Sequence, residues 1–265
     1  MQSDVVSGTA RAAALAHARS FARLCAGTAD VLLDLAGAPD PGDRLLDVGT
    51  GTGTVAAAAR RRGWVAVGVD PDRAVLDLVR RQEDLPLVAA ALPRLPHRSG
   101  AVDAATANFV VNHVPDPRAA TAELLRVVRP GGSVAVTVWP AGGDLARLWA
   151  DVLAAAGVAA PPSRSLPPAL DFDRTAPGLV GLLRDAGGAD ADAAEVGWVW
   201  RVGPADLWAA VEHGLAVVGR TYQAQPASGR RRLRAAFEGL AAERAVDGEL
   251  RLAVRAVAGV ARRSG

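Results

Sequence analysis

The sequence is short of several residue types that would direct it to particular kinds of site. Its 265 residues include one cysteine, Cys25, and no lysine. A single cysteine excludes an internal disulfide and a thiolate metal cluster, and it agrees with a reducing compartment. The absence of lysine excludes Schiff-base chemistry on this chain. The four histidines, His17, His97, His113 and His213, lack metal-ligand spacing, so we expect no metal.

Long apolar runs are also missing. Hydrophobic residues make up 50% of the chain. Even so, no stretch approaches the roughly 18 uninterrupted apolar residues of a membrane span, and the first twenty residues lack the apolar block of a signal peptide. We therefore expect a globular, cytoplasmic protein with one sizeable core and no membrane partner.

Charge of one sign is not in excess, because 30 basic residues against 28 acidic ones leave a formal net charge of +2. The computed isoelectric point of about 9.4 would suggest a nucleic-acid partner. However, the short arginine runs at 60–62 and 230–232 are typical of solvated helix faces. We expect no nucleic acid.

What the sequence does contain is an alternation of strand and helix signals. An amphipathic helical start at residues 11–37 precedes short apolar runs that predict strands, at 44–49, 64–70, 85–90, 101–109 and 132–139. Helices are predicted between them, at 54–62, 71–82 and 117–129. Repeated strand, helix, strand units indicate a parallel sheet that is covered on both faces.

The second half has a different texture, with a proline cluster at 160–168 and helical stretches near 144–156, 204–219 and 229–244. A further helix at 178–188 and strands at 195–202 and 250–260 continue the sheet between these insertions. The predicted boundaries are N-terminal helices 1–40, a core 41–140, a first cap insertion 141–174, core sheet 175–202, a second helical cap insertion 203–245, and a last strand with tail 246–265, in one structural domain.

The stretch "LLDVGTGTG" at residues 45–53 carries most of the functional signal. Its glycines permit either a tight turn into the next helix or a cradle that lets a ligand approach the backbone. Thr54 stands where a dinucleotide fingerprint has its third glycine, and no GK[ST] follows, which excludes a phosphate P-loop. Both interpretations of the glycines, the tight turn and the ligand cradle, therefore remain possible from these residues alone.

Together with "GVDPD" and "RVVRPGGSVAVTVW", this stretch resembles the class I S-adenosylmethionine-dependent methyltransferases over residues 41–140. The resemblance implies an α/β, Rossmann-like, doubly wound and mostly parallel seven-stranded sheet, with N-terminal helices and helical cap insertions. It also implies S-adenosyl-L-methionine as cofactor and S-adenosyl-L-homocysteine as product.

Two carboxylates are the principal candidates for cofactor binding. Asp70, at the end of the second strand, is placed to accept hydrogen bonds from the ribose hydroxyls, with a helix N-cap as the alternative. Asp47 resembles the family's carboxylate that helps hold the methionine end of the cofactor, and its alternative is an acceptor that organises the loop.

The remaining cofactor candidates come from the loop and from the ends of the third and fourth strands. The family's acidic adenine-binding residue is missing, since alanines stand at 89–91. Backbone groups of Ala91 and Leu92 and packing by Pro71 would replace it. The full candidate set is Asp47, Gly49, Thr50, Gly51, Gly53, Asp70, Pro71, Ala91, Leu92, Asn108 and Phe109, of which the last two are equally suited to a core.

Candidates on the acceptor side are fewer. His113 resembles the histidine often seen before "VPD" in this family and is a candidate base, with packing of its loop as the alternative. His213 reaches an acceptor only if its helix caps the pocket. Four tryptophans, Trp149, Trp198, Trp200 and Trp208, fit either an apolar acceptor pocket or ordinary core packing.

We therefore expect a methyltransferase acting on a small, fairly apolar molecule such as a secondary metabolite, on oxygen, nitrogen or carbon. One alternative keeps the cofactor but catalyses a non-methylating, cyclase-like reaction. A macromolecular methyltransferase or a binding module has no supporting signature. The protein is expected to be a monomer or a homodimer.

Overall fold

The computed structural model describes residues 2–81, 84–159 and 166–265. The chain forms two compact units, each built from separate segments. Unit 1 comprises residues 1–24, 142–164 and 197–254, and unit 2 comprises residues 25–141, 165–196 and 255–265.

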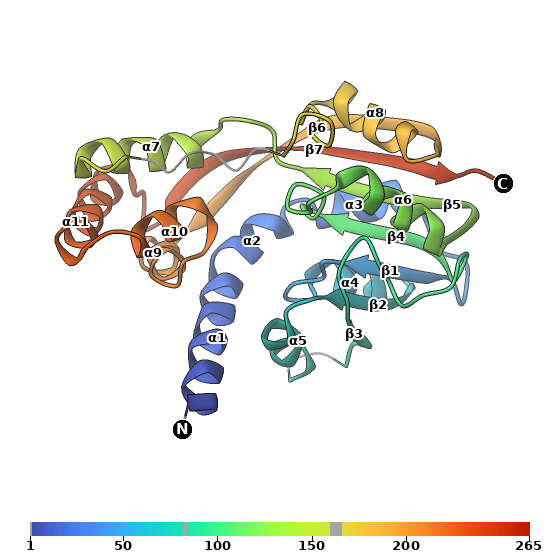
Figure 1. Cartoon of the computed structure of the whole chain (residues 1–265), viewed down its shortest axis with the longest axis horizontal. Coiled ribbons are helices and arrows are strands. Elements are labelled where there is room, and N and C mark those ends of the chain that lie inside the picture. The colour runs from blue at the N-terminus through green and yellow to red at the C-terminus, as the bar shows by residue number, and fades with distance from the viewer. Residues whose placement is uncertain (1, 82–83, 160–165) are drawn as a thin grey trace. The chain divides into compact units, whose positions relative to one another are not determined.

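The described residues form the helices and strands labelled in Figure 1. In chain order they are α1 (Gln2–Arg19), α2 (Phe21–Ala26), α3 (Ala29–Ala36), β1 (Arg44–Val48), α4 (Thr54–Arg61), β2 (Val65–Asp70), α5 (Arg73–Arg80), β3 (Leu87–Ala89), β4 (Val102–Asn108), α6 (Pro117–Val127), β5 (Val128–Val138), α7 (Asp144–Ala156), α8 (Ala176–Asp185), β6 (Gly188–Val202), α9 (Pro204–Glu212), α10 (Ala216–Gln223), α11 (Ala227–Arg244) and β7 (Leu250–Arg263).

The strands form a seven-stranded sheet in the order β3-β2-β1-β4-β5-β7-β6. Strands β1 to β5 pair in parallel, and β7 runs antiparallel to β5. This confirms the predicted doubly wound, mostly parallel sheet. Because β1, β2, β4 and β5 run the same way, their carboxyl ends lie at one edge, which is where ligands bind in such sheets.

Successive residues of the central strands pack into two different cores. Leu45 of β1 packs in a cluster with residues of α3 and α4, whereas Leu46 packs in a cluster with residues of α6 and α8. Neighbouring β4 residues Ala104 and Ala105 divide in the same way. Side chains alternate across a strand, so both faces of the sheet in unit 2 are covered by helices, as predicted.

Several predicted helices begin or end elsewhere. The helical start at 11–37 is three helices, α1, α2 and α3. Helix α5 begins at Arg73 rather than at residue 71, because the Asp72 side chain accepts hydrogen bonds from the amides of the first turn. Helix α6 ends at Val127, since Val128 is extended and opens β5. The stretch 204–219 is broken after His213 by Gly214, which has φ +76°. Residues 160–165 of the proline cluster lie outside the described part of the chain.

Unit 1 is held together by a chain of aromatic rings. Phe237 of α11 stacks on Trp149 of α7 and on Trp208 of α9, with ring centroids 5.5 and 5.1 Å apart. Trp208 in turn meets Tyr222 of α10 edge to face at 5.4 Å. One ring from each of the four helices therefore contributes to this core, and Phe237 is 1% exposed.

Candidate cofactor site and active site

The glycine loop after β1 has the backbone conformation that its sequence requires. Gly49, Gly51 and Gly53 have φ values of +71°, +52° and +78°, in the left-handed region that side chains disfavour. A Cβ at Gly49 would lie 2.3 Å from a methyl of Val110. At Gly51 the nearest atom to a Cβ would be the Gly49 carbonyl oxygen at 3.9 Å. The loop is thus closely packed at its start and open at its centre, as a cradle for a ligand requires.

Asp47 is buried beneath this loop and hydrogen-bonded to it. Its Oδ2 accepts from the Thr50 hydroxyl at 2.7 Å and from the Ala56 amide at 3.2 Å, and its Oδ1 accepts from the Thr106 hydroxyl at 2.9 Å. Desolvation by burial raises the pKa of Asp47 to about 6, although the bonds from Thr50, Thr106 and Ala56 lower it. These contacts are the ones that the loop-organising alternative predicts. A role toward the methionine end of the cofactor stays a prediction.

Asp70 approaches the same loop from the end of β2. Its Oδ2 accepts a hydrogen bond from the Gly51 amide at 3.0 Å, and its Oδ1 accepts from the Asp72 amide at 2.9 Å. The alternative that Asp70 caps the next helix is wrong, because Asp72 is the N-cap of α5. A carboxylate oxygen has two lone pairs, so half-buried Asp70 keeps acceptor capacity beside the open centre of the loop. Ribose binding there stays a prediction.

The adenine candidates lie beyond the same strand ends. Ala89 is the residue of β3 paired with Asp70, so the segment that follows it starts next to the proposed ribose position. Pro71 and Ala91 are exposed and Leu92 is half-buried. The Ala91 carbonyl accepts a hydrogen bond from the Arg94 amide at 3.1 Å. Adenine binding by the backbone of Ala91 and Leu92 stays a prediction.

Asn108, at the end of β4, fastens three segments of unit 2 together. Its Oδ1 accepts from the hydroxyls of Thr28 and Thr137 at 2.8 and 2.6 Å, and its Nδ2 donates to the Cys25 carbonyl at 2.9 Å. The side chain therefore ties the start of α3 to the ends of β4 and β5. This is a positioning role that the sequence did not indicate, and cofactor contact by Asn108 stays a prediction.

Phe109 follows Asn108 in a left-handed conformation, with φ +58°. Its amide donates to the Thr137 hydroxyl at 2.9 Å, and its ring stacks on Trp139 with centroids 3.6 Å apart and planes 6° apart. Phe109 is 4% exposed, whereas Trp139, directly after β5, is half-buried. Sequence reasoning treated Trp139 only as the end of a strand, although a tryptophan at the carboxyl edge of the sheet was a signal that could have singled it out.

The two candidate histidines lie in different units. His113 is an exposed residue of the turn after β4, where its amide donates to the Val110 carbonyl at 2.9 Å. His213 is half-buried at the C-terminal end of α9, in unit 1. Catalysis by either residue stays a prediction.

The four tryptophans all belong to unit 1, but their ring contacts divide them. Trp149 and Trp208 share the ring of Phe237, and the Trp208 Nε1 donates to the Glu212 carboxylate at 2.9 Å. Trp200 stacks on Phe21 of α2 instead, with centroids 6.2 Å apart. For Trp149 and Trp208 these contacts match the core-packing alternative, and an acceptor pocket formed by the four stays a prediction.

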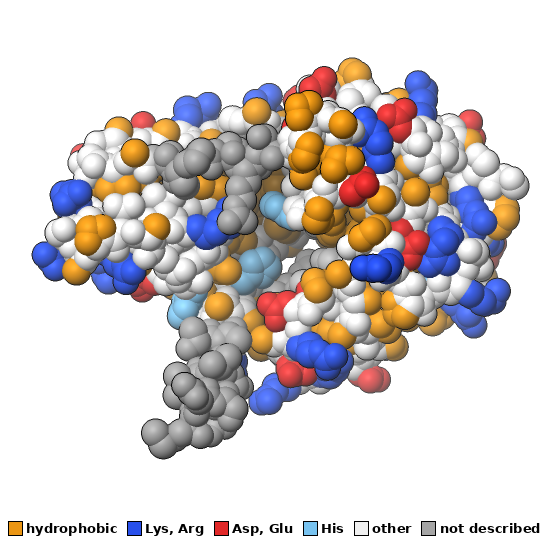
Figure 2. Space-filling view, in the orientation of Figure 1, with side chains coloured by type: hydrophobic (Ala, Val, Ile, Leu, Met, Phe, Trp, Pro, Cys, Tyr) orange, Lys and Arg blue, Asp and Glu red, His pale blue; other side chains and the backbone are white. Residues whose placement is uncertain are grey.

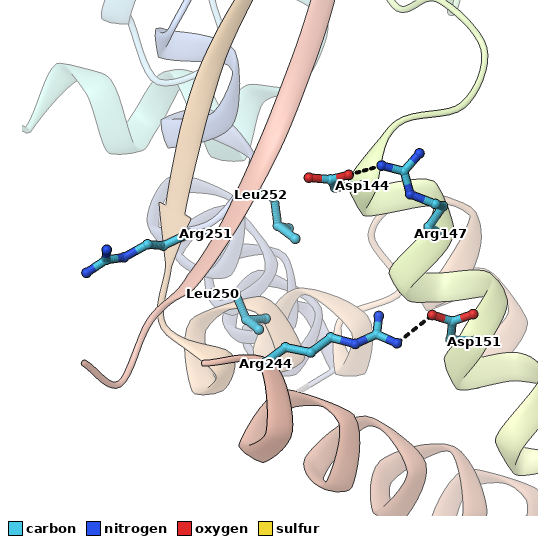
Figure 3. A pocket seen from close by; sticks show the side chains of 7 residues that line it. All are labelled: Asp144, Arg147, Asp151, Arg244, Leu250, Arg251 and Leu252. Carbon is cyan, nitrogen blue, oxygen red and sulfur yellow. Dashed lines mark hydrogen bonds and ion pairs between the residues drawn. The ribbon is translucent and has the colours of Figure 1, made fainter. Parts of the chain in front are cut away.

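A pocket of about 360 Å³ in unit 1 contains none of the predicted site residues. It lies between α7, the end of α11 and the start of β7 (Figure 3). Asp144 pairs with Arg147, and Asp151 pairs with Arg244 at 2.6 Å. Arg251 points away from these pairs in Figure 3 and binds Asp247 at 2.7 Å. The three arginines that line the pocket are thus already paired with carboxylates.

Three further properties concern binding to nucleic acid, membranes and metal ions. In Figure 2 basic and acidic side chains are interspersed over the visible face, without one continuous basic patch. Within the described ranges, no helix is long and apolar enough to cross a membrane. No group of three or more histidine, cysteine or acidic side chains in the same ranges is arranged to hold a metal ion.

Comparisons with known proteins find methyltransferases. Residues 46–136 match a family described as a methyltransferase domain. An uncharacterized methyltransferase of Mycobacterium sp. (strain KMS) is 42% identical over 135 residues, which are 48% of this chain and 54% of that protein. A demethylmenaquinone methyltransferase of Renibacterium salmoninarum is 36% identical over 107 residues, or 40% and 45% of the two chains. The chain thus spans about half the length of these curated relatives.

Among solved structures, a crystal structure titled as a putative methyltransferase from Bacillus halodurans has a TM-score of 0.55 and 15% identity, and the match covers 90% of this chain and all of that one. This likeness confirms the fold. The matches in sequence confirm the predicted resemblance to S-adenosylmethionine-dependent methyltransferases for the segment that carries the glycine loop.

Proposed function

We propose that this chain, whose residues 46–136 form a methyltransferase domain, binds S-adenosylmethionine at the carboxyl ends of β1 and β2 and transfers its methyl group to a small, fairly apolar acceptor. The observation that carries the proposal is the glycine loop with an open centre at Gly51, held on one side by the Asp70 carboxylate.

The residues at this edge suit the cofactor. A Cβ at Gly51 would meet no side chain within 4 Å, and Asp70 offers carboxylate lone pairs to vicinal hydroxyls beside it. When bound, S-adenosylmethionine supplies a methyl group already activated by a sulfonium. The remaining work of the chain is to align the acceptor and exclude water, since displacement at such a carbon depends chiefly on positioning.

The apolar character of the acceptor has two supports. Residues directly after β4 and β5 include the stacked rings of Phe109 and Trp139, which favour an apolar ligand over a charged one. The second is that one relative is named a demethylmenaquinone methyltransferase. We extend to this chain only the class of small apolar acceptors. The acceptor atom, whether oxygen, nitrogen or carbon, is to be identified by product analysis.

Calorimetry with S-adenosylhomocysteine tests the cofactor half of the proposal. We expect saturable binding with a dissociation constant in the micromolar range, and no comparable binding of a nicotinamide dinucleotide. The reverse preference would overturn the assignment.

Transfer of a labelled methyl group from S-adenosylmethionine to a panel of small aromatic and aliphatic alcohols, amines and activated carbons tests the other half. Label in an organic product is the expected outcome. Tight binding of S-adenosylhomocysteine without label transfer to any acceptor would instead favour the non-methylating, cyclase-like alternative.

A further inference from the structure

The Thr137 hydroxyl, near the end of β5, joins the ends of two neighbouring strands. It donates a hydrogen bond to Asn108 Oδ1 at 2.6 Å and accepts one from the Phe109 amide at 2.9 Å. Asn108 Nδ2 donates to the Cys25 carbonyl at 2.9 Å, and because a carbonyl can only accept, this bond leaves Asn108 Oδ1 facing Thr137. The hydroxyl proton is thus committed to Asn108, and an oxygen lone pair faces the Phe109 amide.

The bond from the Phe109 amide supports a conformation that the phenylalanine side chain opposes. Phe109 has φ +58°, in the left-handed region that bulky residues avoid, and such outliers persist only where their surroundings impose them. Thr137 is 0% exposed and Phe109 is 4% exposed, so bulk water does not reach the hydroxyl to replace it. Without the hydroxyl, we expect the chain after β4 to relax toward a negative φ.

The residue that follows, Val110, lies against the glycine loop. A Cβ built at Gly49 would lie 2.3 Å from a Val110 methyl, so Val110 occupies the space that a side chain in place of Gly49 would need. The Gly49 amide also donates to the Val69 carbonyl at 2.7 Å. Gly49 is therefore held by β2 through its amide and by the turn after β4 through Val110, whose position depends on the φ of Phe109.

From these contacts we propose that Thr137 is a positioning residue for the cofactor, which acts on the glycine loop through Phe109 and Val110. The inference rests on the proposed function, because it names a residue outside the loop that keeps the loop open to S-adenosylmethionine. The hydroxyl holds Phe109 left-handed, and Val110 then stays against Gly49. The backbone around Gly51 in turn keeps the conformation that a ligand can approach.

A double-mutant cycle on S-adenosylhomocysteine affinity, measured by calorimetry, tests this path. Thr137→Val keeps the size of the side chain but loses the hydroxyl. We expect it to weaken binding about tenfold, since a left-handed phenylalanine is then no longer imposed. In a Phe109→Gly background the same change should weaken binding by less than about threefold, because glycine adopts this φ without a side-chain penalty. Thr137→Ser, which keeps the hydroxyl, should bind as the wild type does.

Two further variants separate positioning from folding. Thr121→Val is the matched control, because Thr121 is also 0% exposed in unit 2, but its hydroxyl donates to the Pro117 carbonyl of its own helix, α6, at 2.8 Å. It should leave S-adenosylhomocysteine affinity unchanged, whatever its effect on the melting temperature. Val110→Ala removes the methyl groups that lie against Gly49. It should weaken binding about threefold or more, and it tests the path even if Thr137→Val proves too unstable to measure.

Unchanged affinity in Thr137→Val or in Val110→Ala would overturn the inference, and so would an equal loss from Thr137→Val in both backgrounds. The same loss of affinity in Thr121→Val would also overturn it. In each of these cases the proposed function stands, since the wild type binds S-adenosylhomocysteine. Failure of the wild type to bind this ligand would overturn the proposed function and the inference together.

Discussion

Both units of this protein have apolar cores, but they differ in the further contacts that join their elements. In unit 2, buried polar groups such as Asp47, Thr106 and Thr137 hydrogen-bond across neighbouring strands and into the glycine loop. In unit 1, the contacts that join the helices include a chain of aromatic rings centred on Phe237. Directional bonds specify a backbone conformation, whereas ring packing chiefly specifies distance and volume.

This difference leads us to expect different effects from substitutions in the two units. Under the proposed function, the hydrogen bonds of unit 2 hold three left-handed glycines in the one conformation that lets a ligand approach the backbone. Unit 1 has no comparable loop among the residues described. We therefore expect substitutions in unit 1 to change stability, and substitutions at the polar groups of unit 2 to change cofactor binding as well.

The largest effect is expected from Phe237→Ala in unit 1. Removing a fully buried ring between Trp149 and Trp208 should cost about 3–5 kcal/mol of unfolding free energy, measured by urea denaturation. Phe237→Leu, which fills most of the space, should cost less. At urea concentrations below the unfolding transition, S-adenosylhomocysteine affinity should stay the same. A large loss of affinity would contradict the expectation that substitutions in unit 1 change stability alone.

The next effect concerns Asp47 and pH. Its pKa of about 6 in the folded chain lies above its ordinary value of 3.8, so the folded chain holds this proton more tightly than the unfolded chain does. The contribution of Asp47 to stability is therefore greatest below pH 4 and is lost as pH rises through 6, by about 3 kcal/mol in all.

Asp47→Asn isolates this term, because the amide does not titrate. The unfolding free energy of the wild type minus that of the variant should rise as pH falls from 7 to 4. A difference that stays flat over this range would show that Asp47 titrates at its ordinary pKa.

A smaller effect is expected from Asp70→Ala, measured as S-adenosylhomocysteine affinity. The variant loses both the proposed ribose acceptor and the partner of the Gly51 amide, so binding should weaken by about 1–3 kcal/mol. Asp70→Asn keeps one carbonyl acceptor and should lose less. Equal and negligible losses in both variants would remove Asp70 from the proposed site.

The smallest effect is expected from His113→Ala, because His113 is exposed in its turn. Melting temperature and S-adenosylhomocysteine affinity should be unchanged, and kcat should stay within about threefold, since alignment rather than proton transfer dominates methyl transfer. A loss of a hundredfold or more in kcat, with a wild-type rate that rises through pH 6 to 7, would identify His113 as a base.

Much of unit 2 was predictable because its signals are local and periodic. The strand at 44–49 and the helix at 54–62 agree with β1 and α4 to within a residue, since a buried strand and the glycines after it are read from adjacent letters. The predicted start of the helix at residue 71 differs from the start of α5 at Arg73, because Asp70 and Asp72 both precede a helical pattern. Only the hydrogen bonds distinguish them: Asp72 accepts from its own first turn, and Asp70 accepts from the Gly51 loop amide as well as from Asp72.

The sequence by itself determined the order of strands and helices, the left-handed glycine loop, and the carboxylate at the end of the next strand. Tertiary structure alone decided what these groups touch. Asn108 meets Thr28 across 80 positions and Thr106 meets Asp47 across 59, and the stack of Phe109 on Trp139 joins two strand ends 30 residues apart. Contacts of this kind leave no period in the sequence, because they depend on which strands the fold places side by side and on how each chain turns where its strand ends.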